Sequence, residues 1–284
     1  MLKGLSLVIN RLNRRLLAGN DVGRLKKGWL VTLLGVSDPA PCVSFNASGT
    51  SPFVLVSEHA GNLVPEYLEN LGLSGADLND HIGWDLHIRD VGERLSALLD
   101  APYLCQAYSR LVIDCNRPPG AEQSILAVSD KRRIPGNEGL SNAAIKARQD
   151  EIFHPFHGAV AALLGERAAR GQRSILITLH SFTPAMKSGG DDRPWQITFQ
   201  YGRNPDLSKQ LIALMAADPN ITVGDNVPYP VHDDTHYGIP VHGEMRGLPH
   251  TMIELRQDGI DSEAGKACWA HKIADVLGEV LNKI

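Results

Sequence analysis

Four apolar runs of this chain carry polar residues at or near their ends. The runs cover residues 53–59, 111–117, 175–180 and 252–256, and they are rich in Val, Ile and Leu. Continuous runs of this kind are typical of buried parallel strands. In open α/β sheets, ligands bind beyond the carboxyl ends of such strands. We therefore expect three of the runs to bring polar side chains to one rim of a sheet, while the fourth holds Glu254 inside its strand.

The rest of the pattern alternates predicted strands with predicted helices. Ser141 is a suitable N-cap for a long helix, and Pro155 predicts a kink within it. This alternation predicts a single α/β domain. Predicted strands cover residues 53–57, 103–108, 111–115, 174–180, 195–201 and 251–255, and predicted helices cover residues 77–100, 141–171, 207–217 and 262–281.

Size, charge and cysteine content narrow the class of protein. The chain has 284 residues, and its formal net charge of -4 argues against nucleic-acid binding, which usually needs a basic face. Its four cysteines are scattered, with no Cys-x-x-Cys pair, so we expect the reducing environment of the cytoplasm. The apolar segment 29–36 is too short to span a bilayer. We expect neither nucleic acid nor a membrane among the partners.

The N-terminal part differs in composition from the rest. The first 46 residues carry seven Lys or Arg and two Asp, a charge of +5, which leaves -9 for the remaining residues. Residues 37–52 are rich in Ser, Pro, Gly and Asn, which indicates a linker. We therefore expect residues 1–50 to form a basic, poorly ordered extension with a linker, and residues 51–284 to form the functional domain.

Two histidines are candidates for a metal site. His59 and His180 each end a strong apolar run, and a neutral imidazole there is a suitable Zn²⁺ ligand, although either histidine alone is more often structural. Catalytic zinc usually takes a third protein ligand. Asp85 is the candidate, because His81 and Asp85 would share one helix face; its alternative is an ordinary exposed charge. Glu58 is expected to point away from His59.

Glu254 has two readings. A carboxylate inside an apolar strand is costly unless it is paired or hydrogen-bonded. Glu254 could pair with Arg256, which is two residues further on and on the same face of a strand. Alternatively, Glu254 is a general base that takes a proton from water activated by a single zinc ion.

Arginines and an asparagine predict a pocket for substrate carboxylates. Arg110 and Arg117 flank one apolar run and could each hold a carboxylate through paired hydrogen bonds, with Asn116 beside them. Surface charge is the alternative reading. His242, in a loop expected to cover the site, and Arg256 are further candidates for substrate contact.

Six motifs follow one another along the chain: Ser-Glu-His-Ala-Gly-Asn (57–62), His-Ile-Gly-Trp-Asp (81–85), Ser-Arg-Leu-Val-Ile-Asp-Cys-Asn-Arg-Pro (109–118), Leu-His-Ser-Phe-Thr-Pro (179–184), Gly-Asp-Asn-x-Pro-Tyr (224–229) and Arg-Gly-Leu-Pro-His-x-x-Ile-Glu-Leu-Arg-Gln-Asp (246–258). Taken in this order, they resemble the N-formylglutamate amidohydrolase family. That family is similar in organisation to zinc carboxypeptidases and aspartoacylase-like deacylases, which run in the order zinc His, Asn-Arg, zinc His, catalytic Glu. Zinc carboxypeptidases place a Glu three residues after the first His, where this chain has Asn62, so the third ligand stays open between Asp85 and another residue.

The resemblance implies a mixed, mostly parallel sheet flanked by helices, as in zinc peptidases, and a zinc-dependent amidohydrolase. The implied substrate is N-formyl-L-glutamate or a related N-acyl amino acid. A zinc carboxypeptidase, an N-acyl-peptide deacylase and a metal-free protein that binds an acidic metabolite are the alternatives. The expected partner is a small molecule with carboxylate groups, and the sequence does not fix the oligomeric state.

Overall fold

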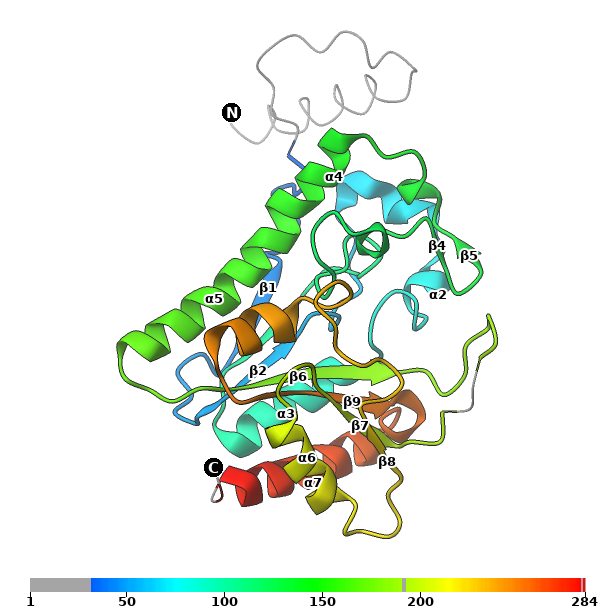
Figure 1. Ribbon diagram of the computed structural model, residues 1–284. Helices are drawn as coiled ribbons and strands as arrows, with labels where there is room; N and C mark the ends of the chain where they lie inside the picture. The colour runs from blue at the N-terminus through cyan, green and yellow to red at the C-terminus, as the bar shows by residue number, and fades with distance from the viewer. Residues whose placement is uncertain (1–31, 191–192, 282, 284) are drawn as a thin grey trace, which may run out of the picture. The chain divides into compact units, whose positions relative to one another are not determined.

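Seven strands form one mixed sheet at the centre of the fold, in the order β1-β3-β2-β6-β9-β7-β8 (Figure 1). The four strands β3, β2, β6 and β9 run parallel to one another, β1 and β7 join them antiparallel, and β8 runs parallel to β7. This confirms the predicted mixed, mostly parallel sheet. The strands are Cys42–Phe45 (β1), Phe53–Ser57 (β2), Tyr103–Gln106 (β3), Ile175–Phe182 (β6), Ile197–Gln200 (β7), Val223–Asp225 (β8) and His250–Arg256 (β9).

The computed structural model describes residues 32–190, 193–281 and 283. Residues 1–31 of the extension and linker expected over residues 1–50 lie outside the described residues. The linker expected over residues 37–52 is wrong at Cys42–Phe45, because these residues form the edge strand β1, which pairs with β3. From Leu33 onwards the chain forms one compact unit. Among the described residues, no helix has both the length and the apolar character needed to cross a membrane.

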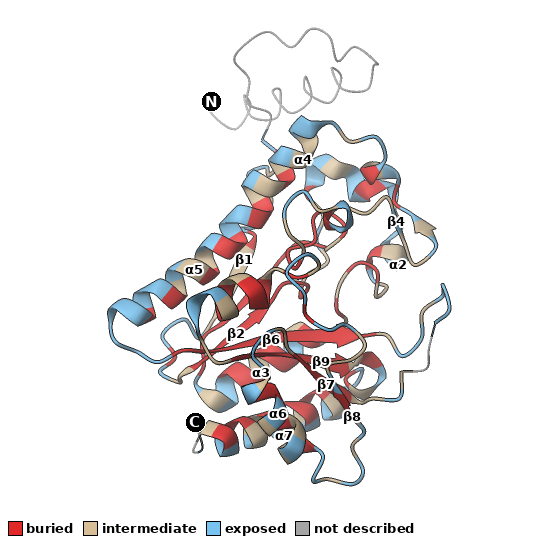
Figure 2. Ribbon diagram, in the orientation of Figure 1, coloured by how far each residue is buried: buried red, intermediate tan, exposed pale blue. Residues whose placement is uncertain are grey.

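Helices cover both faces of the sheet (Figures 1 and 2). The helices α3, α6 and α7 pack on one face, and α5 packs with the turn before it on the other. A small hairpin, β4 and β5, stands apart from the main sheet. These further elements are Gly75–Leu78 (α2), Ile88–Leu99 (α3), Val128–Ser129 (β4), Arg132–Arg133 (β5), Asn142–Arg148 (α4), His154–Ala169 (α5), Asp206–Met215 (α6) and Glu263–Leu281 (α7).

The central strand β2 shows why the sheet is buried on both sides. Phe53 and Leu55 belong to the apolar cluster under α3, α6 and α7, whereas Val54 and Val56 belong to the cluster under α5. Side chains alternate between the two faces of a strand, so a continuous apolar run fills two cores at once.

The helix predicted over residues 141–171 forms with an interruption before Pro155. The Ser141 side chain accepts a hydrogen bond from the Ala144 N–H (3.2 Å) and caps α4. One π-helical turn, Gln149–Phe153, then links α4 to α5, which has Pro155 near its start. Proline lacks an N–H donor, and the wider π-helical turn accommodates it. The predicted kink is therefore present as a π-helical turn.

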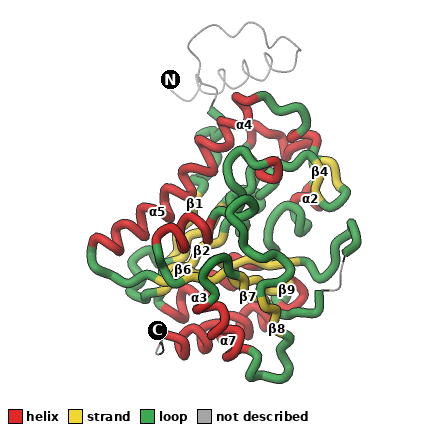
Figure 3. Tube along the Cα trace, in the orientation of Figure 1, coloured by secondary structure: helices red, strands yellow, loops and turns green. Residues whose placement is uncertain are grey.

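The strand predicted at Leu111–Cys115 is wrong. This segment consists of buried turns and loop, and Figure 3 shows loops filling much of the space between β6 and β4. Asp114 causes the turn, because its Oδ1 accepts a hydrogen bond from the Asn116 N–H (2.9 Å) while its carbonyl accepts one from the Arg117 N–H (3.2 Å). An aspartate that bonds its own neighbouring backbone in this way competes with strand pairing.

Candidate metal centre

The parallel strands bring three predicted residues together. His59 lies two residues beyond the end of β2, and β2 pairs with β6, which contains His180. On the other side of β6, Glu254 of β9 is the direct Cα partner of His180. Paired residues on neighbouring strands point to the same face of a sheet. Residues far apart in the sequence therefore meet at one place through strand order and register.

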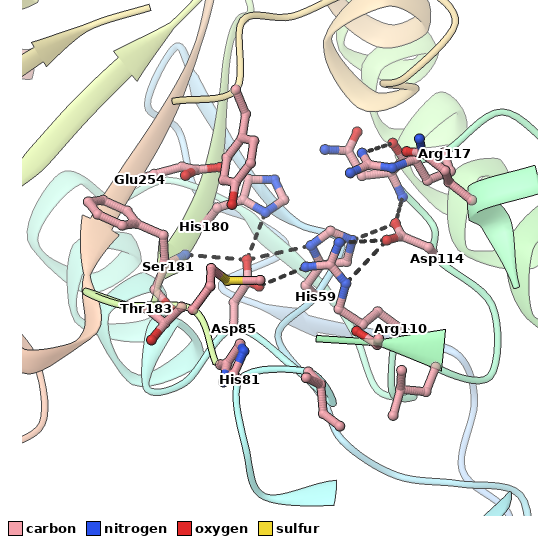
Figure 4. Close-up of a pocket in the computed structure, with 18 of the residues that line it drawn as sticks. His59, His81, Asp85, Arg110, Asp114, Arg117, His180, Ser181, Thr183 and Glu254 are labelled. Carbon is pink, nitrogen blue, oxygen red and sulfur yellow. Dashed lines mark hydrogen bonds and ion pairs between the residues drawn. The ribbon is translucent and has the colours of Figure 1, made fainter. Parts of the chain in front are cut away.

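Asp85 completes the group, although it does not lie on a helix. It sits in the turns that precede α3, and its N–H donates to the His59 carbonyl (2.9 Å). Its Oδ2 lies 2.9 Å from Nδ1 of His180 and 3.5 Å from Nδ1 of His59. All three side chains are buried, and their nearest ligand atoms lie within 4.8 Å of one another (Figure 4). The alternative of an exposed helix charge is wrong for Asp85.

The second ring nitrogen of each histidine faces another carboxylate. Nε2 of His59 lies 2.6 Å from Oδ1 of Asp114, and Nε2 of His180 lies 3.1 Å from Oε2 of Glu58. Carboxylates in this position fix the orientation and tautomer of metal-binding histidines. The arrangement turns both Nδ1 atoms toward Asp85.

Glu58 was expected to point away from His59 on the premise that both residues lie in a strand, but both lie in the turn after β2. The carboxylate is buried beside His180. The loop at Gly238 packs so closely that a Cβ there would lie 2.0 Å from Oε1 of Glu58. Glycine is thus required for this approach.

The electrostatics of the group fit a cation. Burial alone would lower the pKa of His180, but Asp85 and Glu58 outweigh it and raise this pKa to about 10. Burial would raise the pKa of Asp85, yet the charge of His59 and the hydrogen bond to His180 lower it overall. His59 Nδ1 is buried without a hydrogen-bond partner. Two imidazoles and a carboxylate form a suitable donor set for Zn²⁺, so these residues fit the expected metal.

Arg110 is held by the carboxylates of the site. Its Nη2 donates to Oδ2 of Asp114 (2.7 Å), its Nε donates to the same oxygen (3.2 Å), and its Nη1 donates to Oδ1 of Asp85 (3.4 Å). Burial would lower the pKa of Arg110, but Asp114 and Asp85 raise it. Its guanidinium therefore lies at the cavity with its charge already balanced.

Asn116 and Arg117 hold the loop that follows β8. Oδ1 of Asn116 accepts hydrogen bonds from the N–H groups of Tyr237 and Gly238 (both 3.1 Å). Nη1 of Arg117 donates to the Thr235 carbonyl (2.6 Å). Among the described residues, no carboxylate forms an ion pair with Arg117, so its charge is available to a ligand.

Glu254 has the properties of a base. Burial raises its pKa, and its Oε2 has no hydrogen-bond partner among the described residues. The alternative pairing with Arg256 is wrong, since Nε of Arg256 donates instead to Oδ1 of Asp258 (2.8 Å). A buried carboxylate with one free oxygen and a raised pKa is suited to accept a proton near neutral pH.

One cavity of about 190 Å³ joins these groups. It is smaller than the roughly 300–1,000 Å³ of pockets for drug-sized ligands, which favours a small substrate. The predicted residues that line it are His59, Asp85, Arg110, Asn116, Arg117, His180 and Glu254.

A family model described as N-formylglutamate amidohydrolase matches residues 51–260. The chain belongs to the N-formylglutamate amidohydrolase family. It is also similar to the crystal structure of the gene product Atu2144 from Agrobacterium tumefaciens, with 31% identity and a TM-score of 0.84 over 88% of this chain and 98% of that one.

An N-formylglutamate amidohydrolase from Ralstonia eutropha JMP134 shares the fold, with 18% identity and a TM-score of 0.64 over 87% of this chain and 99% of that one. No curated protein matches the sequence. The family resemblance drawn from the motifs is thus confirmed, and the chain is an amidohydrolase by family.

Two predicted substrate contacts of this amidohydrolase lie away from the cavity. His242 is buried behind it, where its Nε2 lies 3.0 Å from Nδ1 of His157 and burial lowers its pKa to about 3. Arg256 instead donates from Nη1 to the carbonyls of Arg193 (3.1 Å) and Pro194 (3.2 Å). A single sequence does not distinguish a loop histidine that covers a site from one that packs beneath it.

The sequence analysis missed other residues of the amidohydrolase site. Glu58 was named but set aside; it directly follows β2, which is buried throughout, so the argument that singled out Glu254 would also have marked it. Asp114 was noted as part of a motif, but its contact with His59 depends on the turn that replaces the predicted strand. Arg193 and Tyr229 line the cavity from distant loops, and no periodic signal in the sequence points to them.

Proposed function

We propose that this chain is a metal-dependent amidohydrolase that cleaves the amide bond of N-formyl-L-glutamate or a related N-acyl amino acid. The observation that carries the proposal is the meeting of His59, Asp85 and His180 beside the unpartnered oxygen of Glu254. Membership of the N-formylglutamate amidohydrolase family supports the reaction class.

His59, Asp85 and His180 would hold one Zn²⁺ ion. When bound, the ion would supply a Lewis acid that polarises the amide carbonyl and lowers the pKa of water. Asp114 and Glu58 keep the two imidazoles turned toward the ion through contacts to their Nε2 atoms.

Glu254 would move the proton. Its Oε2 takes a proton from the attacking water, the water oxygen bonds to the carbonyl carbon, and the carbon–nitrogen bond breaks as Glu254 returns the proton to the nitrogen. The products are a carboxylic acid and an amine; the acid then gives its proton to the amine, which leaves a carboxylate and the ammonium form of the amino acid, so atoms and charge balance. In the metal-free site, burial raises the pKa of Glu254 above its ordinary value, which favours uptake of a proton.

Arg117 and Asn116 would position the carboxylate of the amino acid. Arg117 has no carboxylate partner among the described residues, and a planar guanidinium can hold a substrate carboxylate through paired hydrogen bonds. Arg110, whose charge is balanced by Asp85 and Asp114, lines the cavity and would instead offer its remaining N–H groups to the substrate.

A formate-release assay with metal analysis tests the proposal. N-formyl-L-glutamate should be hydrolysed, EDTA should abolish the activity, and Zn²⁺ should restore it. The variant Glu254→Gln should keep its metal and lose turnover by roughly 10²–10⁴-fold, whereas Glu166→Gln, at an exposed carboxylate that contacts Arg170, should behave as wild type. Full activity of Glu254→Gln would refute the assigned base, and a protein that binds no metal after reconstitution would refute the metal site.

A further inference from the structure

Arg193 is a half-buried cation in the cavity wall without a carboxylate partner among the described residues. Its Nη1 donates to the Thr183 carbonyl (3.2 Å), and its Nη2 donates to the Tyr229 hydroxyl (2.5 Å). The guanidinium carbon lies 5.3 Å from the centre of the Tyr229 ring. Each contact fixes the guanidinium but leaves its positive charge unbalanced.

Arg256 fixes the backbone that carries Arg193. It donates to the carbonyls of Arg193 and Pro194, while its own charge is paired with Asp258. Arg256 ends β9, the strand that holds Glu254. The position of Arg193 is therefore tied to the strand of the proposed base through one side chain.

The cavity arginines differ in how their charges are balanced. Arg110 pairs with Asp85 and Asp114, whereas neither Arg117 nor Arg193 pairs with a carboxylate of the described chain. Thr183, which accepts a hydrogen bond from Arg193, and Arg117 lie on opposite sides of the metal group in Figure 4. Two cations that form no ion pair with a described carboxylate thus border one small cavity.

We propose that Arg193 is a second carboxylate-binding residue and that Arg256 is its positioning residue, so that the enzyme selects substrates with two carboxylates. This inference rests on the proposed hydrolysis of N-acyl amino acids. One substrate carboxylate binds Arg117, and the second binds the remaining N–H donors of Arg193. The second carboxylate belongs either to an acidic amino-acid side chain or to the far end of a dicarboxylic acyl group.

Two matched substrate pairs test the selection. N-formyl-L-glutamate is compared with N-formyl-L-glutamine, which lacks only the side-chain charge, and N-succinylglycine is compared with N-butyrylglycine, which lacks the acyl carboxylate. In the wild type, the charged member of one pair should have the higher kcat/KM by roughly 10–100-fold, and the pair that shows this identifies the source of the carboxylate.

Variants of Arg193 and Arg256 test whether these residues cause the preference for the charged substrate. Arg193→Gln should remove the preference by lowering kcat/KM for the charged substrate much more than for the neutral one, while Arg193→Lys should restore part of it. Arg256→Gln should weaken the preference, mainly through KM for the charged substrate. Arg170→Gln, at an exposed ion pair with Glu166, removes an arginine elsewhere and should keep the full preference. A preference that is absent, or that survives in Arg193→Gln, overturns the inference.

Calorimetry separates this inference from the proposed function. L-glutamate, glutarate and L-glutamine are titrated into the full-length protein loaded with Zn²⁺, with no turnover required. Binding of a dicarboxylate that weakens in Arg193→Gln supports the subsite even if no N-acyl amino acid is cleaved. Two results overturn the subsite. One is hydrolysis that shows no preference for the charged substrate, and the other is a protein that hydrolyses nothing and binds no dicarboxylate.

Discussion

Replacing Asp114 with Asn should disturb both folding and metal binding, because one buried carboxylate serves three neighbours. Its Oδ1 contacts Nε2 of His59 (2.6 Å) and accepts from the Asn116 N–H (2.9 Å). Its Oδ2 accepts two hydrogen bonds from Arg110. In Asp114→Asn the amide oxygen can keep the first two contacts, but its NH₂ group faces the donors of Arg110.

The loss of stability in Asp114→Asn follows from the contacts that are lost. Hydrogen bonds to charged groups contribute about 1.5–3 kcal/mol each, and breaking one side of a buried ion pair costs about 3–5 kcal/mol. Arg110 keeps a longer contact of 3.4 Å to Asp85, which softens the loss. We therefore expect the free energy of unfolding to fall by about 3 kcal/mol. Metal affinity should fall by roughly 10–100-fold, because His59 loses a charged orienting partner.

Urea denaturation of the metal-free protein measures the first effect, and Zn²⁺ titration against a chelating dye measures the second. Asp233→Asn is the control, because Asp233 pairs with Arg203 on the surface and both side chains are mostly exposed. That variant should change the free energy of unfolding by about 1 kcal/mol or less. The reasoning is refuted if Asp114→Asn is no less stable than Asp233→Asn and binds Zn²⁺ as tightly as the wild type.

Three further results are expected. First, kcat/KM should fall with decreasing pH through a pKa above the ordinary Glu value of about 4.3, since burial raises the pKa of Glu254 and only its ionised form is a base; an acid limb at or below that value would contradict this role. Second, Arg148→Met should lower the free energy of unfolding, measured by urea denaturation, by about 3 kcal/mol or more, because three acceptor oxygens lose a buried donor. Unchanged stability of this variant would show that these oxygens find other partners. Third, hydrogen bonds from Asn46 and Thr50 lower the pKa of Asp100 to about 2, so its stabilising effect should be complete above the unfolded value of about 3.9 and disappear as pH falls toward 2. The acid-unfolding curve of Asp100→Asn should be correspondingly flatter over that range, and an identical curve would exclude the contribution.

Strand positions were predictable because a strand that is buried on both faces appears in the sequence as a nearly continuous apolar run. The runs at 53–57 and 175–180 are mostly apolar, and the structure buries both of them in the centre of the sheet. The run at 111–115 has the same composition, yet it folds as buried turns, since Asp114 bonds its own backbone. Apolar composition reports burial, whereas strand pairing depends on where the backbone donors and acceptors find partners.

The same distinction explains the site. His59, His180 and Glu254 stood out because a polar residue in or after a buried strand needs a partner or a role. The partners themselves, such as Glu58, depend on how the chain turns after β2, and that turn leaves no periodic pattern in the sequence.

By itself, the sequence determined the α/β class, the family and the residues whose chemistry suits hydrolysis, because composition and order along the chain carry that information. Only the tertiary structure decided that Asp85 joins the two histidines, that His242 lies behind the cavity, and that Arg256 supports Arg193. These outcomes depend on loop paths and strand register, which bring together atoms from residues far apart in the chain, such as Asp85 and His180, which are 95 positions apart. Local propensity does not encode such distances, since they are set by the packing of the whole chain.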